Sequence, residues 1–348
     1  MPEAIQLSTN SNSNLVVFGW IVFSIVSSTS LILLLKGVKP HLPNCQWTIT
    51  LSTFHFISTW FALFILSSCG LIRKVSREIP IHKRILLASL VMMSIIFMNY
   101  NLTTNSIGFY QMSKLVCIPY MIIFNMIFKN QKYTAYELIS LVVLLAGVGL
   151  FSVSDVELNR LGIFFAIIAV LSTVHNQMLT GSYQAEYSIN GPELQLAIIP
   201  FETIFSFFSS IALEGKSFFG QPYLDMTTIL LLAGTCFFAI GVNIATFGLI
   251  GKTSSVTYQV VGHLKTVLLL IFGYIFFPSK WDSKMQMIRA ILGICTALAG
   301  VFLYTAARLD IQKKRFEESE RKPLLADKGG SIDELVPADE EENNETNQ

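Results

Sequence analysis

The chain has 348 residues, of which 52% are hydrophobic and only 14% are charged, and its mean hydropathy is +0.57. A soluble domain carries about 25% charged residues, so this composition excludes an ordinary soluble protein. The net charge of +1 gives no sign of a nucleic-acid partner. The apolar residues gather in blocks of about 20, the helix length that crosses a lipid hydrocarbon core of about 30 Å.

In chain order, these blocks predict an all-α polytopic membrane protein with ten transmembrane helices, joined by segments too short to form a soluble domain. The predicted helices cover residues 15–35, 47–70, 85–104, 107–128, 134–153, 161–182, 194–213, 227–250, 256–277 and 286–306.

The segment before the first helix, residues 1–14, contains no Lys or Arg. Cleaved secretory signals and organellar transit peptides both need basic residues, so we expect neither, and the first helix is expected to be an uncleaved insertion signal. Of the 24 Lys and Arg residues, 15 fall on the side that holds both termini, seven on the other side and two inside helices. Cytoplasmic segments are enriched in these residues, which predicts cytosolic termini.

The two halves of the chain resemble each other. Tyr110-Gln111 aligns with Tyr258-Gln259 at an offset of 148 residues, and 145–148 aligns with 298–301 at an offset of 153. Because the repeated unit has five helices, an odd number, the second copy is expected to be inverted in the membrane, as in many secondary transporters. The predicted parts are a cytosolic N-terminal tail (1–14), a first repeat (15–153), a second repeat (154–308) and a disordered cytosolic C-terminal tail (309–348).

Two lysines lie well inside predicted helices, Lys114 about 10 Å and Lys265 about 13 Å from the helix start. A lysine at the centre of a membrane helix costs about 2.5–3.5 kcal/mol, so it usually faces the bundle interior or a water-filled cavity. Helical spacing places Tyr110 beside Lys114, and Tyr258 and Gly262 beside Lys265. Two cations at one cavity favour an anion with several oxygens, such as phosphate or diphosphate.

One acidic residue, Glu202, is clearly intramembrane. Three roles are open for it: a structural pair with a lysine, a proton-coupling group, or contact with substrate hydroxyls. His55 and residues 175–177 either line a path or make interhelical hydrogen bonds, whereas His263 is expected to pack. The five cysteines are scattered, and no nucleophile elbow or phosphate-binding loop is present. From the sequence we expect no catalytic residue, no metal site and no cofactor, and we expect that the protein is not an enzyme.

The run GKTSSVTYQVVGHLKT at residues 251–266, together with the Tyr-and-Lys segment of the fourth helix, resembles the nucleotide-sugar transporter and triose-phosphate translocator branch of the drug/metabolite transporter superfamily. The resemblance covers about residues 15–308 and implies that Lys114 and Lys265 contact substrate phosphate. Triose-phosphate translocators have Arg after the second lysine, whereas this chain has Thr266. The Lys-Thr pair is similar to the subgroup that exchanges UDP-sugars such as UDP-galactose or UDP-xylose for UMP in the Golgi.

The resemblance therefore implies a nucleotide-sugar antiporter that works by alternating access in the Golgi membrane. Two rival hypotheses are a carrier of another organic phosphate or organic anion, and a non-transporting membrane receptor or scaffold. A homodimer is left open. Glu202 has no counterpart in the family pattern. The residues expected at the substrate site are Lys114, Lys265, Tyr110, Tyr258, Gly262, Thr266, Asn243 and Glu202.

The C-terminal tail becomes polar and then acidic. It contains an acid, three residues and two leucines (Glu320, Leu324 and Leu325), the pattern that cytosolic sorting adaptors bind. This pattern predicts either adaptor-dependent sorting toward endosomal or lysosomal membranes, or a plain solvated tail.

Overall fold

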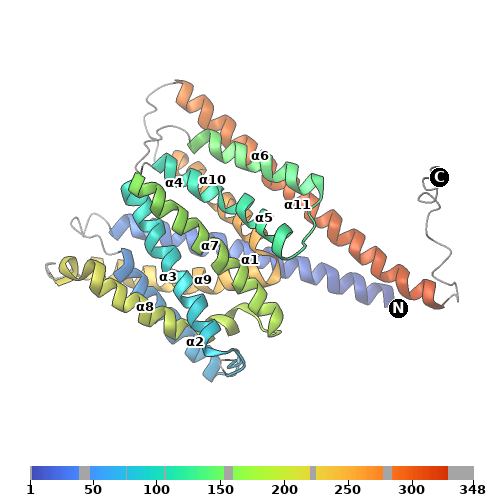
Figure 1. Ribbon diagram of the computed structural model, residues 1–348, viewed down its shortest axis with the longest axis horizontal. Helices are drawn as coiled ribbons and strands as arrows, with labels where there is room; N and C mark the ends of the chain where they lie inside the picture. Colours follow the sequence, from blue (N-terminus) through green and yellow to red (C-terminus); the bar gives the residue numbers. More distant parts are fainter. Residues whose placement is uncertain are drawn as a thin grey trace, which may run out of the picture.

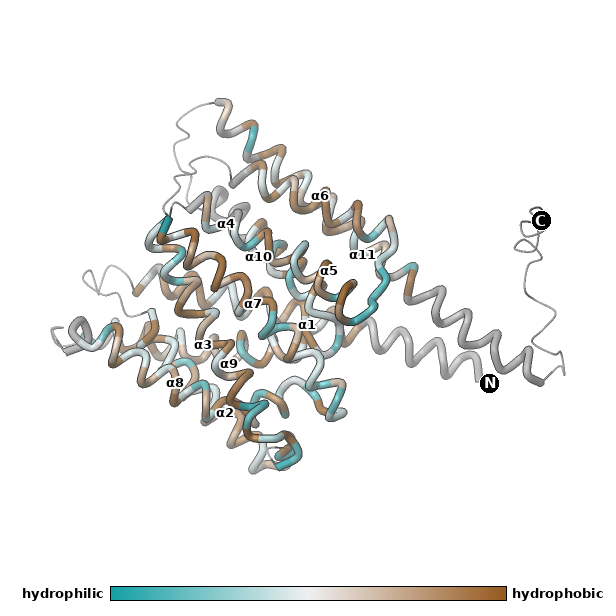
Figure 2. The backbone as a smooth tube through the Cα atoms, in the orientation of Figure 1, coloured by the Kyte–Doolittle hydropathy of each residue, from teal (hydrophilic) through white to brown (hydrophobic). Residues whose placement is uncertain are grey.

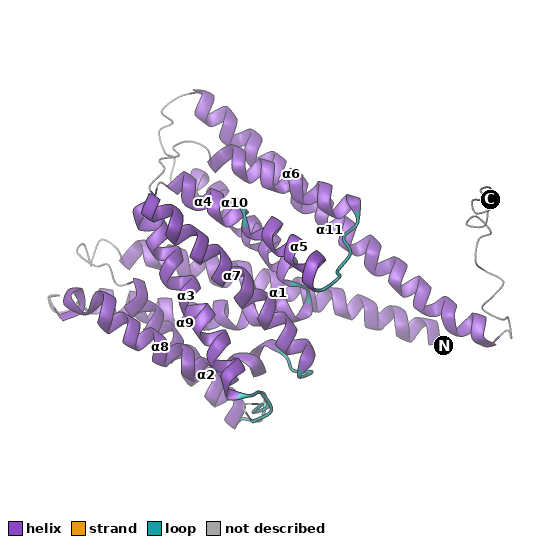
Figure 3. Cartoon of the chain, viewed as in Figure 1, coloured by secondary structure: helices purple, strands orange, loops and turns teal. Residues whose placement is uncertain are grey.

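The computed structural model describes seven ranges of the chain: residues 2–38, 48–75, 77–105, 107–152, 160–219, 225–276 and 284–327. Within these ranges the regular secondary structure is entirely helical (Figure 3), which confirms the all-α prediction. The helices are α1 (Pro2–Val38), α2 (Thr48–Ser68), α3 (Ile81–Thr104), α4 (Ile107–Leu115), α5 (Cys117–Phe128), α6 (Ala135–Ser152), α7 (Arg160–Glu186), α8 (Gly191–Phe219), α9 (Met226–Lys252), α10 (Ser255–Phe276) and α11 (Lys284–Asp327).

Six of these helices are long and apolar enough to cross a membrane: α1, α2, α3, α7, α8 and α9. Three shorter apolar stretches lie at residues 113–128, 135–150 and 291–307. Figure 2 shows hydrophobic residues along the helices and hydrophilic ones gathered in the connecting turns. The chain is therefore a multi-pass membrane protein.

The predicted fourth transmembrane helix is interrupted in the structure. α4 ends at Leu115, and Val116 N–H donates to the Ser113 carbonyl at 3.2 Å instead of continuing the α-helical pattern. Pro119 explains the break, because it has no N–H for the Leu115 carbonyl and its ring crowds that oxygen. The prediction of one continuous helix is wrong here, and the break directly follows Lys114.

The helices pack mainly as four pairs: α6 with α11, α3 with α7, α1 with α9, and α2 with α8. In Figure 1 the α6–α11 pair forms the upper layer, and α2 and α8 lie at the lower edge. The main core cluster joins α5, α6, α7, α10 and α11, and members with no exposed surface include Ile118, Met121, Leu144, Val174 and Val267.

Two glycines set the distance between α6 and α11. A Cβ added to Gly147 would lie 2.2 Å from the backbone N of Ala297, and one added to Gly300 would lie 2.4 Å from the backbone N of Leu144. No side chain fits into such gaps, so the two backbones are in direct contact. Small residues commonly permit this approach between membrane helices.

The N-terminus of α2 is capped by a carboxylate from α8. Buried Glu214 accepts hydrogen bonds from Ile49 N at 2.9 Å and from Thr50 N at 2.8 Å. These N–H groups have no partner within their own helix. One turn further along α2, the Thr53 and Ser206 hydroxyls hydrogen-bond at 2.7 Å. Polar contacts therefore join α2 to α8 along an otherwise apolar surface.

We expect Glu214→Ala to lower the free energy of unfolding by about 1–3 kcal/mol, because two N–H groups lose a charged acceptor. Thermal unfolding of the detergent-purified protein measures the change. Glu78→Ala, at a partly exposed position in the α2–α3 connection, is the control and should cost less than about 1 kcal/mol. Equal unfolding midpoints for the wild type and Glu214→Ala would contradict a stabilising role for this cap.

Helical structure extends into both predicted tails, although the C-terminal one was expected to be disordered. α1 begins at Pro2, so most of the predicted N-terminal tail is helical, and α11 continues to Asp327, so residues 309–327 are helical where disorder was predicted. Residues 311–322 are rich in Lys, Arg, Glu and Gln and lack Gly and Pro, a composition that favours helix. Residues 328–348 lie outside the described ranges.

Candidate functional site

Lys265 is half-buried in the middle of α10 and contacts α1. Its Nζ donates to Ser24 Oγ at 2.7 Å and to Ser28 Oγ at 3.1 Å. The same Nζ lies 5.8 Å from the centre of the Tyr258 ring, within cation–π range. Because the two serines are four residues apart, one face of α1 receives the ammonium group. Neutral hydroxyls solvate this charge without neutralising it.

The surroundings of Lys265 on α10 are ordered by hydrogen bonds. The Tyr258 hydroxyl lies 3.2 Å from Thr246 Oγ1 of α9, and Thr246 donates its own proton to a carbonyl one turn earlier, so the tyrosine donates. The Thr266 hydroxyl donates to the Gly262 carbonyl at 3.2 Å. A Cβ at Gly262 would meet nothing within 4 Å, so open space lies beside the lysine.

Lys114 lies at the end of α4, and its Nζ is 4.2 Å from the centre of the Tyr110 ring. His263 of α10 is buried, as predicted. His263 and Lys265 are two residues apart and so project from nearly opposite sides of α10. The structure brings Lys114 together with Tyr110 and Lys265 together with Tyr258, but no hydrogen bond or ring contact among the described residues joins the two pairs.

Glu202 of α8 has no exposed surface, and neither carboxylate oxygen has a hydrogen-bond partner among the described residues. Ile199 and Phe205, three residues to either side, belong to an apolar cluster with Phe56 of α2 and Met92 of α3. The structural pair with a lysine is therefore not formed in this structure. Proton coupling and contact with substrate hydroxyls stay open.

We expect Glu202→Gln, which keeps the shape and removes the charge, to leave the midpoint of thermal unfolding unchanged or higher. The reason is that an unpaired carboxylate in apolar surroundings opposes folding. Thermal unfolding in detergent measures this, and Glu214→Gln serves as the contrasting variant, because that carboxylate caps α2. A fall of several degrees in Glu202→Gln would show that Glu202 does have a stabilising partner.

Asn243 of α9 lies beside α2, where its Nδ2 donates to Thr59 Oγ1 at 2.9 Å. The sequence did not predict three residues that the structure adds: Ser24, Ser28 and Thr246. The polar run Ser27-Ser28-Thr29-Ser30 inside an apolar helix could have indicated a functional face. Nothing in the sequence, however, showed that the first predicted helix contacts Lys265 of the ninth.

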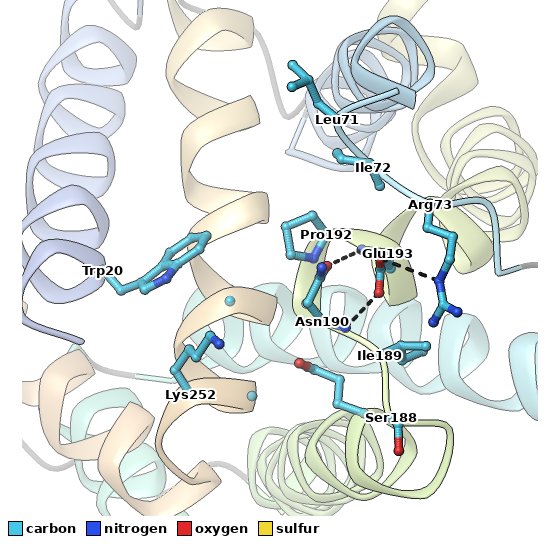
Figure 4. Close-up of a pocket in the computed structure, with 14 residues that line it drawn as sticks. Trp20, Leu71, Ile72, Arg73, Ser188, Ile189, Asn190, Pro192, Glu193 and Lys252 are labelled. Atoms are coloured by element: carbon cyan, nitrogen blue, oxygen red, sulfur yellow. Dashed lines mark hydrogen bonds and ion pairs between the residues drawn. The ribbon is translucent and has the colours of Figure 1, made fainter. Parts of the chain in front are cut away.

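A polar cavity of about 600 Å³ opens where α1, the α7–α8 turn and the end of α9 meet (Figure 4). Arg73 and Lys252 line it, and Arg73 Nε lies 3.8 Å from a Glu193 oxygen. Asn190 caps α8 by accepting from Glu193 N at 3.0 Å, and the Glu193 carboxylate accepts in return from Asn190 N at 2.9 Å. With two basic groups and one acidic group, this opening carries positive charge that attracts anions toward the bundle.

The predicted sorting residues Glu320, Leu324 and Leu325 fall in the last part of α11. Their side chains lie outside the described part of the chain, so the sorting motif stays a prediction.

Comparison with known proteins gives a consistent result. The model of the Triose-phosphate Transporter family matches residues 13–305. UDP-xylose transporter 3 of Arabidopsis thaliana is 31% identical over 341 residues, which cover 93% of this chain and 92% of the relative. UDP-rhamnose/UDP-galactose transporter 2 of the same organism is 34% identical over 276 residues, 78% of this chain and 76% of the relative.

One solved crystal structure has a TM-score of 0.64 at 11% identity, covering 85% of this chain and 98% of its own, and so supports the fold alone. The matched family and both named relatives are transporters, which confirms the prediction that the chain is not an enzyme. This chain belongs to the Triose-phosphate Transporter family.

Proposed function

We propose that this protein is a nucleotide-sugar transporter whose cargo is a UDP-sugar. The observation that carries the proposal is Lys265, an ammonium group inside the helix bundle that contacts hydroxyls and an aromatic ring but no carboxylate among the described residues. A charge in this position is stabilised by an anionic ligand. The names of the relatives, UDP-xylose transporter 3 and UDP-rhamnose/UDP-galactose transporter 2, supply the class of anion.

In this proposal the diphosphate binds to the two lysines. Lys265 contacts it on α10, and Lys114, at the break after α4, approaches when the helices rearrange around bound cargo. Lysine binds phosphate as a strong point charge. Tyr110 and Tyr258 shape the space beside the ammonium groups, Gly262 leaves room, and Thr266 and Asn243 add hydrogen bonds to the cargo, Asn243 away from the diphosphate.

The proposal includes a five-plus-five inverted repeat, in which α4 and α5 together make the fourth crossing. In such a repeat the corresponding helices are α1 and α7, α2 and α8, α3 and α9, and α6 and α11. If each helix is replaced by its counterpart, the α3–α7 pair becomes the α9–α1 pair, and the α6–α11 and α2–α8 pairs stay the same. Gly147 and Gly300 correspond at the repeat offset of 153, and so do the residues they meet, Leu144 and Ala297. A two-fold axis in the membrane plane produces contacts that map onto themselves in this way.

The repeats alternate the exposure of the site, exchanging a cytosolic UDP-sugar for a luminal nucleoside monophosphate across the Golgi membrane. Exchange follows if the empty carrier, with its lysines uncompensated, reorients slowly. α1 begins and α11 ends at the same end of the bundle, to the right in Figure 1, which supports termini on one side of the membrane, here the cytosolic side.

Uptake by the purified protein in proteoliposomes tests the proposal. We expect uptake of UDP-xylose or UDP-galactose that UMP inhibits, that phosphoenolpyruvate does not inhibit, and that is faster in vesicles preloaded with UMP. Uptake of phosphoenolpyruvate but of no UDP-sugar would overturn the cargo assignment. Equal rates with and without preloaded UMP would overturn obligatory exchange.

A further inference from the structure

A second, mainly apolar cavity of about 180 Å³ lies between α1, α2, α3 and α9. The polar side chains in its lining are Ser52 and His55 of α2 and Asn243 of α9. Its apolar walls include Leu31, Phe56 and Ile95. Lys114 and Lys265 do not line this cavity, and it has no lining residue in common with the larger cavity of Figure 4.

The face of α1 that receives Lys265 continues to this cavity. Ser24 and Ser28, which accept hydrogen bonds from Lys265, share one face with Leu31 of the cavity wall, because the three residues have helical i, i+4 and i+7 spacing. The cavity therefore begins about one helical turn along α1 from the ammonium group.

α9 provides a second, independent connection. Asn243 lies one turn before Thr246, which contacts the Tyr258 hydroxyl at 3.2 Å, and Tyr258 in turn lies beside Lys265. If a phosphate is bound at Lys265, a chemical group bonded directly to that phosphate is therefore close enough to enter this cavity.

The hydrogen bonds of His55 leave one ring nitrogen as an acceptor. Nε2 lies 3.2 Å from Thr235 Oγ1, and the Thr235 hydroxyl donates its single proton to the Leu232 carbonyl at 2.7 Å. The threonine oxygen therefore accepts from His55, so Nε2 carries the proton. In the neutral imidazole Nδ1 is then an acceptor, and it has no hydrogen-bond partner among the described residues.

The orientation of the Asn243 amide follows from the same argument. Its Nδ2 donates to Thr59 Oγ1 at 2.9 Å, while the Thr59 hydroxyl donates its proton to the His55 carbonyl at 2.8 Å. The group facing Thr59 must therefore be the NH₂, and the amide oxygen Oδ1 has no partner among the described residues. Two acceptors from opposite walls, with no cation beside them in the lining, select for hydrogen-bond donors.

Building on the proposed function, we propose that this cavity is the sugar subsite: His55 Nδ1 and Asn243 Oδ1 accept hydrogen bonds from ring hydroxyls of the sugar whose diphosphate binds at Lys265. The apolar walls lie against the C–H groups of the ring. The volume equals that of roughly six water molecules, room for one sugar ring but not for the nucleoside in addition. The acceptors repel a second phosphate, which excludes a bisphosphate cargo from this position.

The test compares the binding of UDP and UDP-xylose to the full-length protein in detergent, because these ligands differ only by the sugar. We expect His55→Leu and Asn243→Leu each to weaken binding of UDP-xylose by about three- to tenfold, the effect of one lost hydrogen bond, and to change binding of UDP by less than about twofold. Ser58→Ala is the control on α2, since its exposed hydroxyl bonds only to the Phe54 carbonyl; it should change neither affinity.

A second experiment varies the substrate as well as the protein. The ligands are deoxy analogues of UDP-xylose that each lack one ring hydroxyl. We expect one analogue to bind the wild type several-fold more weakly than UDP-xylose does. On one of the two leucine variants, the same analogue and UDP-xylose should bind equally well. Equal losses for UDP and UDP-xylose, no loss for either, or deoxy penalties that persist in both variants would overturn the subsite. A wild type that binds neither UDP nor UDP-xylose would instead overturn the proposed function, and the subsite with it.

Discussion

Lys265→Ala is expected to lower the initial rate of UDP-sugar uptake by at least about 30-fold while the protein stays folded. Truncating a buried charged group that contacts an opposite charge costs about 2–5 kcal/mol, and each 1.4 kcal/mol is a factor of ten. Folding is expected to survive because, among the described residues, the groups that lose a partner are the Ser24 and Ser28 hydroxyls and the face of Tyr258. Uptake into proteoliposomes and thermal unfolding measure the two effects separately.

Lys132→Ala is the matched control, since this lysine is exposed between α5 and α6. It should retain the wild-type uptake rate, which also excludes a general effect of lowering the net charge. Wild-type transport by Lys265→Ala would mean that the cargo is bound elsewhere in the protein, and the function proposed above would fall.

Gly147→Ala and Gly300→Ala are expected to be among the most destabilising small substitutions in the described part of the chain, at about 3 kcal/mol each. An added methyl group would overlap backbone atoms of the facing helix, which cannot move aside as a flexible side chain does. The helices must separate, and the contacts between α6 and α11 weaken along their length. The midpoint of thermal unfolding in detergent measures the loss.

The double variant provides a sharper criterion. Once one methyl group has separated the helices, the second meets less resistance, so the combined loss should be smaller than the sum of the single losses. Gly19→Ala is the control, because a Cβ there would meet nothing within 4 Å. A double variant with fully additive losses would contradict a shared contact, and stable single variants would contradict the close approach itself.

The sequence predicted the parts of the site that depend on spacing along one helix. The placement of Tyr258 beside Lys265 follows from helical geometry, and the structure gives the 5.8 Å ring contact. The partners of Lys265 on α1 could not be predicted, because 237 residues separate Ser28 from the lysine and no local pattern records which distant helices touch. For the same reason the isolation of Glu202 from both lysines was not foreseeable.

The helix boundaries show the same division between local and distant causes. Most predicted apolar blocks coincide with helices within a few residues, since length and hydropathy are local properties. The break after Leu115 was also within reach, because Pro119 stands in the sequence, but the length of the apolar block masked it. The Glu214 cap on α2 was not predictable, because the acid and the N–H groups it contacts are 164 and 165 residues apart.

The two serine hydroxyls on Lys265 have a consequence for how loading triggers movement. These hydrogen bonds join α10 to α1, a helix of the opposite half of the chain. In the proposed function a phosphate oxygen of the cargo competes for the same N–H donors, so binding of the cargo would break these hydrogen bonds while it supplies a stronger partner. In this proposal Ser24 and Ser28 hold α10 against α1 until the anionic cargo replaces them as partners of Lys265.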